Sequence, residues 1–270
     1  MAELKLIIQP DQDDDEAAEV LVDGRLGDRP YRFLLDTGAA RTSVQLDDYT
    51  STFSSEATNS SSGVFAPIQD DVITVPSLEI GPISKQNFTL VRSNDPQRNM
   101  PGLIGMDILK DFCCHFLFAE QRVLLDAEHE CGIGSSFQPL FLDQKFHPYV
   151  EVQFGAVTAN SVWDTGAGIT IADLGFVQKH PALFEQVGHS TGTDAGGTQV
   201  QTPMFIMAAS LIGGSSFPPH KVAGVDLSRV NATLDVPMDL ILGYSTLSKA
   251  NWVFDFPRKQ WAVSKRLGVQ

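Results

Sequence analysis

Short runs of apolar residues, separated by turn-forming residues, extend along most of this chain. EVLVDGRL at 19–26 and RVLLD at 122–126 are two of them. Runs of this length between Gly, Pro, Asn and Asp are typical of β-strands. Helical periodicity is confined to IGMDILKDF at 104–112, LGYSTLSKA at 242–250 and the Pro-interrupted segment LGFVQKHPALFEQV at 174–187. The pattern therefore predicts a mostly β protein with a few short helices.

The pattern of apolar and polar positions occurs twice. The tetrapeptide Asp-Thr-Gly-Ala follows an apolar pair at 36–39 and again 128 residues later, at 164–167. Further along, GLIGMDIL at 102–109 corresponds to LILGYSTL at 240–247, with two apolar residues before a glycine in each. A pattern that recurs at a nearly constant offset indicates an internal duplication.

The duplication predicts how the chain divides into domains. Residues 126–138, DAEHECGIGSSFQ, have the Gly and Ser content of a connector between the two copies. We therefore expect an N-terminal lobe over residues 1–134, which carries the first Asp-Thr-Gly. A C-terminal lobe over residues 135–270 carries the second.

Composition and charge narrow the classes of partner. The 270 residues are 43% hydrophobic, which is enough for sizeable cores, and 33 acidic against 19 basic residues give a net charge of −14. Because this field repels polyanions, we expect no nucleic acid and no membrane as partners. The first residues, MAELKLIIQPDQDDDE, lack the apolar region of a signal peptide, so we expect a cytoplasmic protein, or an exported one whose leader has been removed. The acidic run at 11–16 is interpreted as a solvated turn between two strands, with a regulatory element as the alternative.

The cysteines and histidines predict no metal site. Cys113, Cys114 and Cys131 do not form a disulfide framework, and reduced thiols are expected. No Cys-x2-Cys or His-Glu-x-x-His spacing occurs, so neither a metal nor another cofactor is expected.

The repeated Asp-Thr-Gly predicts a pair of carboxyl groups. An apolar strand would carry Asp36 and Asp164 to strand ends in apolar surroundings, where a lone carboxylate is costly. If the two copies pack face to face, the carboxyl groups meet and cannot both ionise freely. The ionised member could then deprotonate a water molecule while the protonated member polarises an amide carbonyl. The residues expected to support the pair are Thr37, Gly38, Thr165 and Gly166. The alternative is that both copies are ordinary Asx turns without chemistry.

These residues resemble the aspartic proteases. The resemblance rests on Asp-Thr-Gly-Ala after an apolar pair, followed by Leu103-Ile104-Gly105 in the first copy and Ile241-Leu242-Gly243 in the second. The alanine and the short copies are more similar to retropepsins than to pepsins, although both copies are fused in one chain. The resemblance implies a bilobal fold of two pseudo-two-fold-related, β-barrel-like lobes with short helices. It also implies that Asp36 and Asp164 are catalytic and that Thr37 and Thr165 hydrogen bond across the lobes.

The resemblance further implies hairpin flaps that close over the substrate. The glycine-containing segments at 61–67 and 191–199 suit mobile hairpin tips. Neither contains a tyrosine of the pepsin kind. The residues expected to contact substrate there are Gly63, Val64, Phe65, Ala195, Gly196 and Gly197.

Together these features predict an aspartic endopeptidase. It would hydrolyse peptide bonds in extended, partly apolar segments through a water activated by Asp36 and Asp164, and it would act as a monomer on a protein or peptide substrate. The alternative is a non-catalytic peptide-binding or regulatory module on the same fold.

Overall fold

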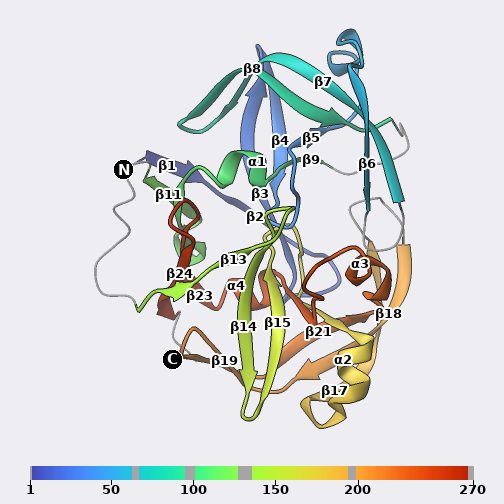
Figure 1. The fold of residues 1–270 in the computed structure, drawn as a ribbon, viewed down its shortest axis with the longest axis vertical. Helices are drawn as coiled ribbons and strands as arrows, with labels where there is room; N and C mark the ends of the chain where they lie inside the picture. Colours follow the sequence, from blue (N-terminus) through green and yellow to red (C-terminus); the bar gives the residue numbers. More distant parts are fainter. Residues whose placement is uncertain (1, 63–66, 95–100, 127–135, 194–198, 267–270) are drawn as a thin grey trace.

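The computed structural model describes residues 2–62, 67–94, 101–126, 136–193 and 199–266 (Figure 1). Within these ranges the chain is mostly β, as predicted, and its strands form three sheets. We call residues 2–126 the first half and residues 136–266 the second half. The predicted lobe boundary near Gly134 lies outside the described residues.

Each half builds one large sheet of its own. The eight-stranded sheet of the first half has the strand order β2 (Ile7–Pro10), β3 (Ala18–Leu26), β4 (Arg29–Leu35), β9 (Gly102–Ile104), β5 (Ser43–Val44), β8 (Ile83–Arg92), β7 (Pro67–Ile80) and β6 (Ala57–Ser62). The ten-stranded sheet of the second half has the order β17 (Phe184–Thr193), β18 (Gln199–Met207), β21 (His220–Val225), β16 (Ile171–Asp173), β22 (Leu240–Leu242), β15 (Val157–Trp163), β14 (Pro148–Phe154), β19 (Ser210–Ile212) and β20 (Ser215–Phe217), with β13 (Phe141–Leu142) beside β14.

The two large sheets repeat the same pairings in the same register. Strand β4 pairs in parallel with β9, so that Leu35 lies opposite Ile104, and β15 pairs in parallel with β22, so that Trp163 lies opposite Leu242. In both halves a short strand, β5 or β16, pairs antiparallel to β9 or β22 and parallel to β8 or β21. These equivalent positions are those that the sequence repeat aligns.

The third sheet contains strands of both halves. Its order is β1 (Ala2–Lys5), β11 (Arg122–Asp126), β10 (Cys113–Leu117), β23 (Ala250–Asp255), β24 (Gln260–Arg266) and β12 (Gln138–Pro139). The halves join where β10 pairs antiparallel with β23, Phe116 lying opposite Trp252. Figure 1 shows β1, β11, β23 and β24 on the side of the molecule where both termini lie.

The helices are short, as the sequence predicts. Helices α1 (Met106–Leu109) and α4 (Tyr244–Leu247) occupy equivalent places directly after Gly105 and Gly243. The Pro-interrupted segment forms α2 (Leu174–Lys179) followed by the 3-10 helix η3 (Pro181–Leu183). The remaining helical turns are α3 (Ser228–Asn231), η1 (Thr50–Thr52) and η2 (Phe118–Glu120). No helix in the described ranges has both the length and the apolarity that crossing a bilayer requires.

One hydrophobic core runs through both halves, and aromatic rings form its centre. Trp163, from β15, lies 4.6 Å from Phe116 of β10 and 4.5 Å from Phe254 of β23, measured between ring centroids. All three side chains are fully buried. Aromatic groups bury large apolar areas, so this cluster stabilises the junction of the halves.

The cysteines on β10 differ from expectation. Cys114 is a buried free thiol in the core, whereas Cys113, its neighbour on the strand, is disulfide-bonded. Adjacent strand residues point to opposite faces, so the two side chains lie on opposite sides of β10, although both are fully buried. The expectation of reduced thiols is therefore wrong for Cys113, because spacing along the chain does not reveal which cysteines the fold brings within bonding distance.

We predict that Phe254→Ala lowers the free energy of unfolding by about 3–5 kcal/mol, because it leaves a cavity among buried rings at the junction of the halves. Urea denaturation followed by fluorescence measures the change. Phe141→Ala is the control, since Phe141 is 47% exposed. A loss in Phe254→Ala no larger than that in Phe141→Ala would contradict the assigned role of the ring cluster.

Candidate active site

The two Asp-Thr-Gly turns begin where the paired parallel strands end. The backbone N–H of Asp36 donates to the carbonyl of Ile104 at 2.9 Å, and that of Asp164 donates to the carbonyl of Leu242 at 3.0 Å. Each aspartate is therefore held by the apolar-apolar-Gly segment of its own half. The apolar pair before each Asp is buried in the sheet, which fixes where the turn starts.

The two turns meet, and their carboxyl groups share donors. The N–H of Gly38 lies 2.9 Å from Oδ1 of Asp36 and 3.1 Å from Oδ1 of Asp164, whereas the N–H of Gly166 donates to Oδ1 of Asp164 at 2.8 Å. The two carboxyl groups also hydrogen bond to each other. Asp36 and Asp164, 128 residues apart in the chain, thus form one site, as the sequence predicts they could.

Glycine is required at positions 38 and 166 because each packs against the opposite carboxyl group. A Cβ atom at Gly38 would lie 2.6 Å from Oδ2 of Asp164, and one at Gly166 would lie 2.5 Å from Cγ of Asp36. Real Cβ contacts are not this short, so any larger residue would push the turns apart. Each glycine therefore sets the approach of the other half's aspartate.

The threonines join the two turns reciprocally. The N–H of Thr37 donates to Oγ1 of Thr165 at 3.1 Å, and the N–H of Thr165 donates to Oγ1 of Thr37 at 3.1 Å. The hydroxyl of Thr37 in turn donates to the carbonyl of Trp163 at 2.9 Å. Both threonines are buried, so these bonds are made without competition from water.

A second threonine in each half accepts a hydrogen bond from the glycine of the apolar-apolar-Gly segment. The sequence alone assigned no role to it. Oγ1 of Thr42 accepts from the N–H of Gly105 at 3.1 Å, and Oγ1 of Thr170 accepts from the N–H of Gly243 at 3.1 Å. The signal was present in the sequence, because these threonines are also related by the offset of 128 residues.

The partners of these second threonines differ between the halves. In the first half the N–H and hydroxyl of Thr42 donate to the carboxylate of Asp107. In the second half the N–H of Thr170 donates to the hydroxyl of Ser245 at 3.0 Å, and the Thr170 hydroxyl lies 2.6 Å from that of Thr246. A charged acceptor in one half is thus replaced by neutral hydroxyls in the other.

The surroundings of the carboxyl groups favour one proton held between them. Asp36 is only 7% exposed, whereas Asp164 is partly exposed. Burial, reinforced by the negative charge of Asp164, raises the pKa of Asp36 well above its ordinary value. Burial also raises the pKa of Asp164, but the N–H donors of Gly166 and Gly38 oppose that rise. Two close carboxyl groups with raised pKa values titrate as a unit, and Asp36 is the better proton holder.

The residues predicted for the flaps lie outside the described residues. Gly63, Val64, Phe65, Ala195, Gly196 and Gly197 are all in this group. The strands around them are described: β6 pairs antiparallel with β7, and β17 with β18. Each half therefore carries an antiparallel pair of strands at the place where the sequence predicts a flap.

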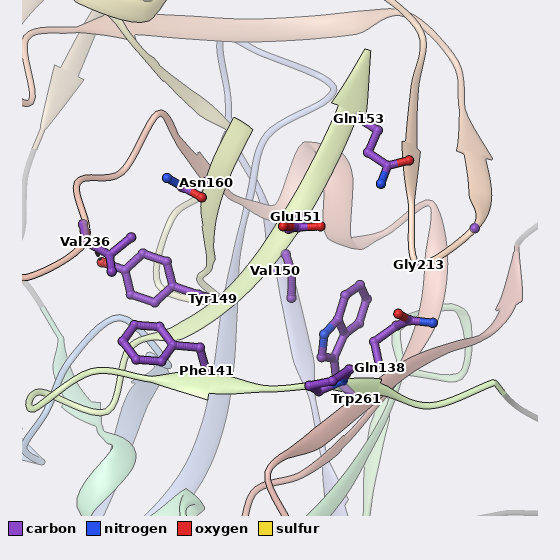
Figure 2. A pocket seen from close by; sticks show the side chains of 12 residues that line it. Gln138, Phe141, Tyr149, Val150, Glu151, Gln153, Asn160, Gly213, Val236 and Trp261 are labelled. Carbon is purple, nitrogen blue, oxygen red and sulfur yellow. Dashed lines mark hydrogen bonds between the residues drawn. The ribbon is translucent and has the colours of Figure 1, made fainter. Parts of the chain in front are cut away.

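A pocket of about 550 Å³ is separate from the two turns (Figure 2). It lies over β14 and is lined at one end by Phe141 and Tyr149, whose ring centroids are 5.3 Å apart, with Glu151 between them and Gly213. None of its lining residues belongs to either Asp-Thr-Gly turn. Within the described part of the chain, no group of three or more His, Cys, Asp or Glu side chains is placed to hold a metal ion.

The comparison with known families finds a match to the part of the chain that contains the first turn. Residues 22–111 match a family model described as gag-polyprotein putative aspartyl protease. This range includes Asp36 and the segment from Leu103 to Gly105. No curated protein matches the chain.

We predict that Thr37→Val destabilises the protein by about 2 kcal/mol or more, because it leaves the buried N–H of Thr165 and the carbonyl of Trp163 without a partner. Thermal and urea unfolding measure the loss. Thr89→Val is the matched control: its hydroxyl pairs with Thr74 on an exposed strand face, so we expect a change within about 0.5 kcal/mol. Equal effects in the two variants would show that the bonds between the turns do not stabilise the fold.

The raised pKa of Asp36 also predicts a pH-dependent stability. A group whose pKa is raised on folding stabilises the folded state fully below its unfolded pKa, and that contribution disappears as the pH rises through the folded pKa. Asp36→Asn should therefore be more stable than the parent at pH 7, by about 1 kcal/mol or more, with the difference vanishing toward pH 3.

Urea titrations across this pH range measure the effect, with Asp23→Asn as the control because Asp23 is an exposed carboxylate. If Asp36→Asn is less stable than the parent at pH 7, burial beside Asp164 does not raise the pKa of Asp36.

Proposed function

We propose that this chain is a retropepsin-like aspartic endopeptidase with Asp36 and Asp164 as its catalytic pair, a proposal supported by the match of residues 22–111 to the aspartyl protease family model. The observation that carries the proposal is the shared donor: a single N–H, that of Gly38, hydrogen bonds to a carboxyl oxygen of both aspartates. A donor shared in this way holds the two groups close enough to share one proton and to bind one water molecule between them.

The asymmetry of the pair supports distinct roles for the two carboxyl groups. Asp164, which accepts from two backbone N–H groups and is partly exposed, is the ionised member and takes a proton from the water. Asp36 holds the proton and donates it in a hydrogen bond to the oxygen of the scissile carbonyl. As the water oxygen attacks the carbonyl carbon, the Asp36 proton passes to the carbonyl oxygen and gives a tetrahedral diol. Asp164 then gives the proton it took from the water to the peptide nitrogen, a diol hydroxyl returns a proton to Asp36, and cleavage of the C–N bond releases the amine and the carboxylic acid.

The proposal includes a bilobal fold made of two copies of one unit. Its support is the repeated register of β4 with β9 and of β15 with β22, together with the two turns that meet between them. We assign residues 1–134 and 135–270 to the two lobes, related by a pseudo-two-fold axis. Because one chain supplies both aspartates, the site is complete in a monomer.

The substrate we propose is an extended, partly apolar segment of a polypeptide. The family match supports a protein substrate in general. The hairpins β6–β7 and β17–β18 would cover the segment from the two lobes, and the predicted flap residues between their strands would contact it. A strand-like peptide can hydrogen bond to such hairpins along its backbone, which favours extended substrates.

Digestion of a mixed peptide library, read by mass spectrometry from pH 3 to 8, tests the proposal. We predict that Asp36→Asn and Asp164→Asn each lower kcat by about 10³ or more, since each removes one partner of the acid–base pair. Asp28→Asn, an exposed carboxylate, is the control with unchanged turnover.

A folded Asp36→Asn variant with full turnover would overturn the catalytic assignment. Binding of library peptides without any products in the parent protein would instead favour a non-catalytic peptide-binding module on the same fold.

A further inference from the structure

His220 is a buried histidine in the second half that the catalytic pair does not use. It begins β21, is 3% exposed, and both of its ring nitrogens are engaged. Nδ1 lies 2.9 Å from the carbonyl oxygen of Pro218, and Nε2 lies 2.7 Å from Oγ1 of Thr246. Thr246 follows three residues after Gly243, in α4.

The partners of His220 determine which nitrogen carries its proton. The carbonyl of Pro218 can only accept, so Nδ1 must be the donor. In a neutral imidazole Nε2 is then an acceptor, and the hydroxyl of Thr246 donates to it. Oγ1 of Thr246 remains free to accept from the hydroxyl of Thr170, 2.6 Å away. Oγ1 of Thr170 accepts from the N–H of Gly243. In each hydrogen bond from His220 to Gly243, one group therefore donates and the other accepts.

The chain of hydrogen bonds ends at the loop that carries Asp164. Gly243 packs so closely on this loop that a Cβ atom there would lie 2.6 Å from the carbonyl oxygen of Ala167. The next residue, Tyr244, donates its N–H to that same carbonyl at 2.8 Å. The position of the segment after Asp164 therefore depends on Gly243 and Thr170, and through them on His220.

Protonation of His220 would break this order. A proton on Nε2 turns it into a donor to Oγ1 of Thr246, whose hydroxyl must then turn toward Thr170. The hydroxyl of Thr170 is left with the carbonyl of Gly243, at 3.5 Å. That carbonyl already accepts from the N–H groups of Thr246 and Leu247 at 2.9 and 3.0 Å. The hydroxyl of Thr170 would then have only a long contact to a carbonyl oxygen that already accepts two hydrogen bonds.

The charged groups around His220 come from the other half as well as its own. Lys249 follows α4, and Glu16 lies in the turn between β2 and β3; their charges act on His220 in opposite directions, with a 3.7 Å ion pair between them. Beside them, Lys221 pairs with Asp14 at 3.1 Å. The acidic run of the first half is thus ion-paired to the second half rather than only solvated. Just after this run, the N–H of Ala18, at the start of β3, donates to the carbonyl of Gly168 in the loop after Asp164 at 3.2 Å.

We propose that His220 is a positioning residue for the catalytic loop of Asp164 and that it performs this role only as the neutral imidazole. The proposal rests on the proposed proteolytic function, to which it adds a site of pH control in the second half. Burial lowers the pKa of His220 and so favours the neutral ring. Once the ring is protonated, the loop loses this support.

The first half holds its equivalent threonine without a histidine in the residues that the structure describes. The equivalent threonine, Thr42, is held by the carboxylate of Asp107, whose two oxygens accept from the threonine N–H and hydroxyl. Within the described residues no histidine hydrogen bonds to Thr42 or Asp107. The loop of Asp164 should therefore respond to the titration of His220, while the loop of Asp36 should not.

The test compares His220→Gln, His220→Phe and the parent in steady-state hydrolysis of a cleaved library peptide between pH 3 and 8. Glutamine presents an acceptor to Thr246 but does not titrate, so we predict that it moves the acid limb of kcat to lower pH by about one unit. Phenylalanine fills the space without an acceptor. We predict that it lowers kcat about tenfold at neutral pH with KM changed less than about twofold, and that glutamine restores most of this loss.

His180→Gln is the control, because His180 is only partly buried after α2, lies outside the turns and the proposed flap hairpins, and should leave the profile unchanged. A second readout does not need activity: the amide resonances of Thr170 and Gly243 should titrate with the imidazole of His220 in the parent and not in His220→Gln. Identical acid limbs in the parent and His220→Gln, or Thr170 and Gly243 amides that do not titrate, would overturn the proposal. If the parent cleaves no peptide at all, the proposed function fails, and the amide titration still decides whether His220 positions the loop.

Discussion

The close approach of two buried carboxyl groups is the constraint that the rest of the structure serves. Asp36 and Asp164 lose hydration and repel each other when both are charged, so unaided they would separate. Backbone N–H groups of Gly38 and Gly166 stabilise the charge, and the reciprocal bonds of the threonines hold the turns at fixed spacing. Behind them, the aromatic cluster around Trp163 resists separation of the halves. A site that is unfavourable locally is thus stabilised by a continuous core.

The two halves have the same backbone pairings but differ in the groups that surround their aspartates. Their backbone registers match residue for residue, yet Asp36 is buried while Asp164 is partly exposed. The acceptor behind Thr42 is a carboxylate, whereas the network behind Thr170 is neutral and ends at His220. The two halves supply two turns of the same shape, and the differences in their surroundings give the two carboxyl groups the different proton affinities that the proposed acid and base roles need.

The sequence was sufficient to predict the parts of the site that are local. Asp-Thr-Gly after an apolar strand specifies a strand end, a turn and a close backbone approach within a few residues, which is enough to predict two turns that can meet. The mostly β fold follows from the short apolar runs. Asp107 behind Thr42 and His220 behind Thr246 were not found, because these contacts join residues 65 and 26 positions apart that carry no common motif. The disulfide of Cys113 was missed for the same reason. Pairings set by the tertiary fold leave no periodic signal in one sequence.

Fusion of the two halves into one chain is what permits a control on one side only. In a symmetric dimer of identical chains, a histidine behind one catalytic loop is necessarily present behind the other, and protonation would act on both at once. Here His220 and its neutral hydroxyl chain serve the loop of Asp164, while Asp107 holds the loop of Asp36 by a carboxylate. Protonation of His220 would therefore act on the loop of Asp164 and not directly on the turn of Asp36. Two similar halves in one chain can thus differ behind their turns, and this difference provides the asymmetry that the proposed mechanism needs.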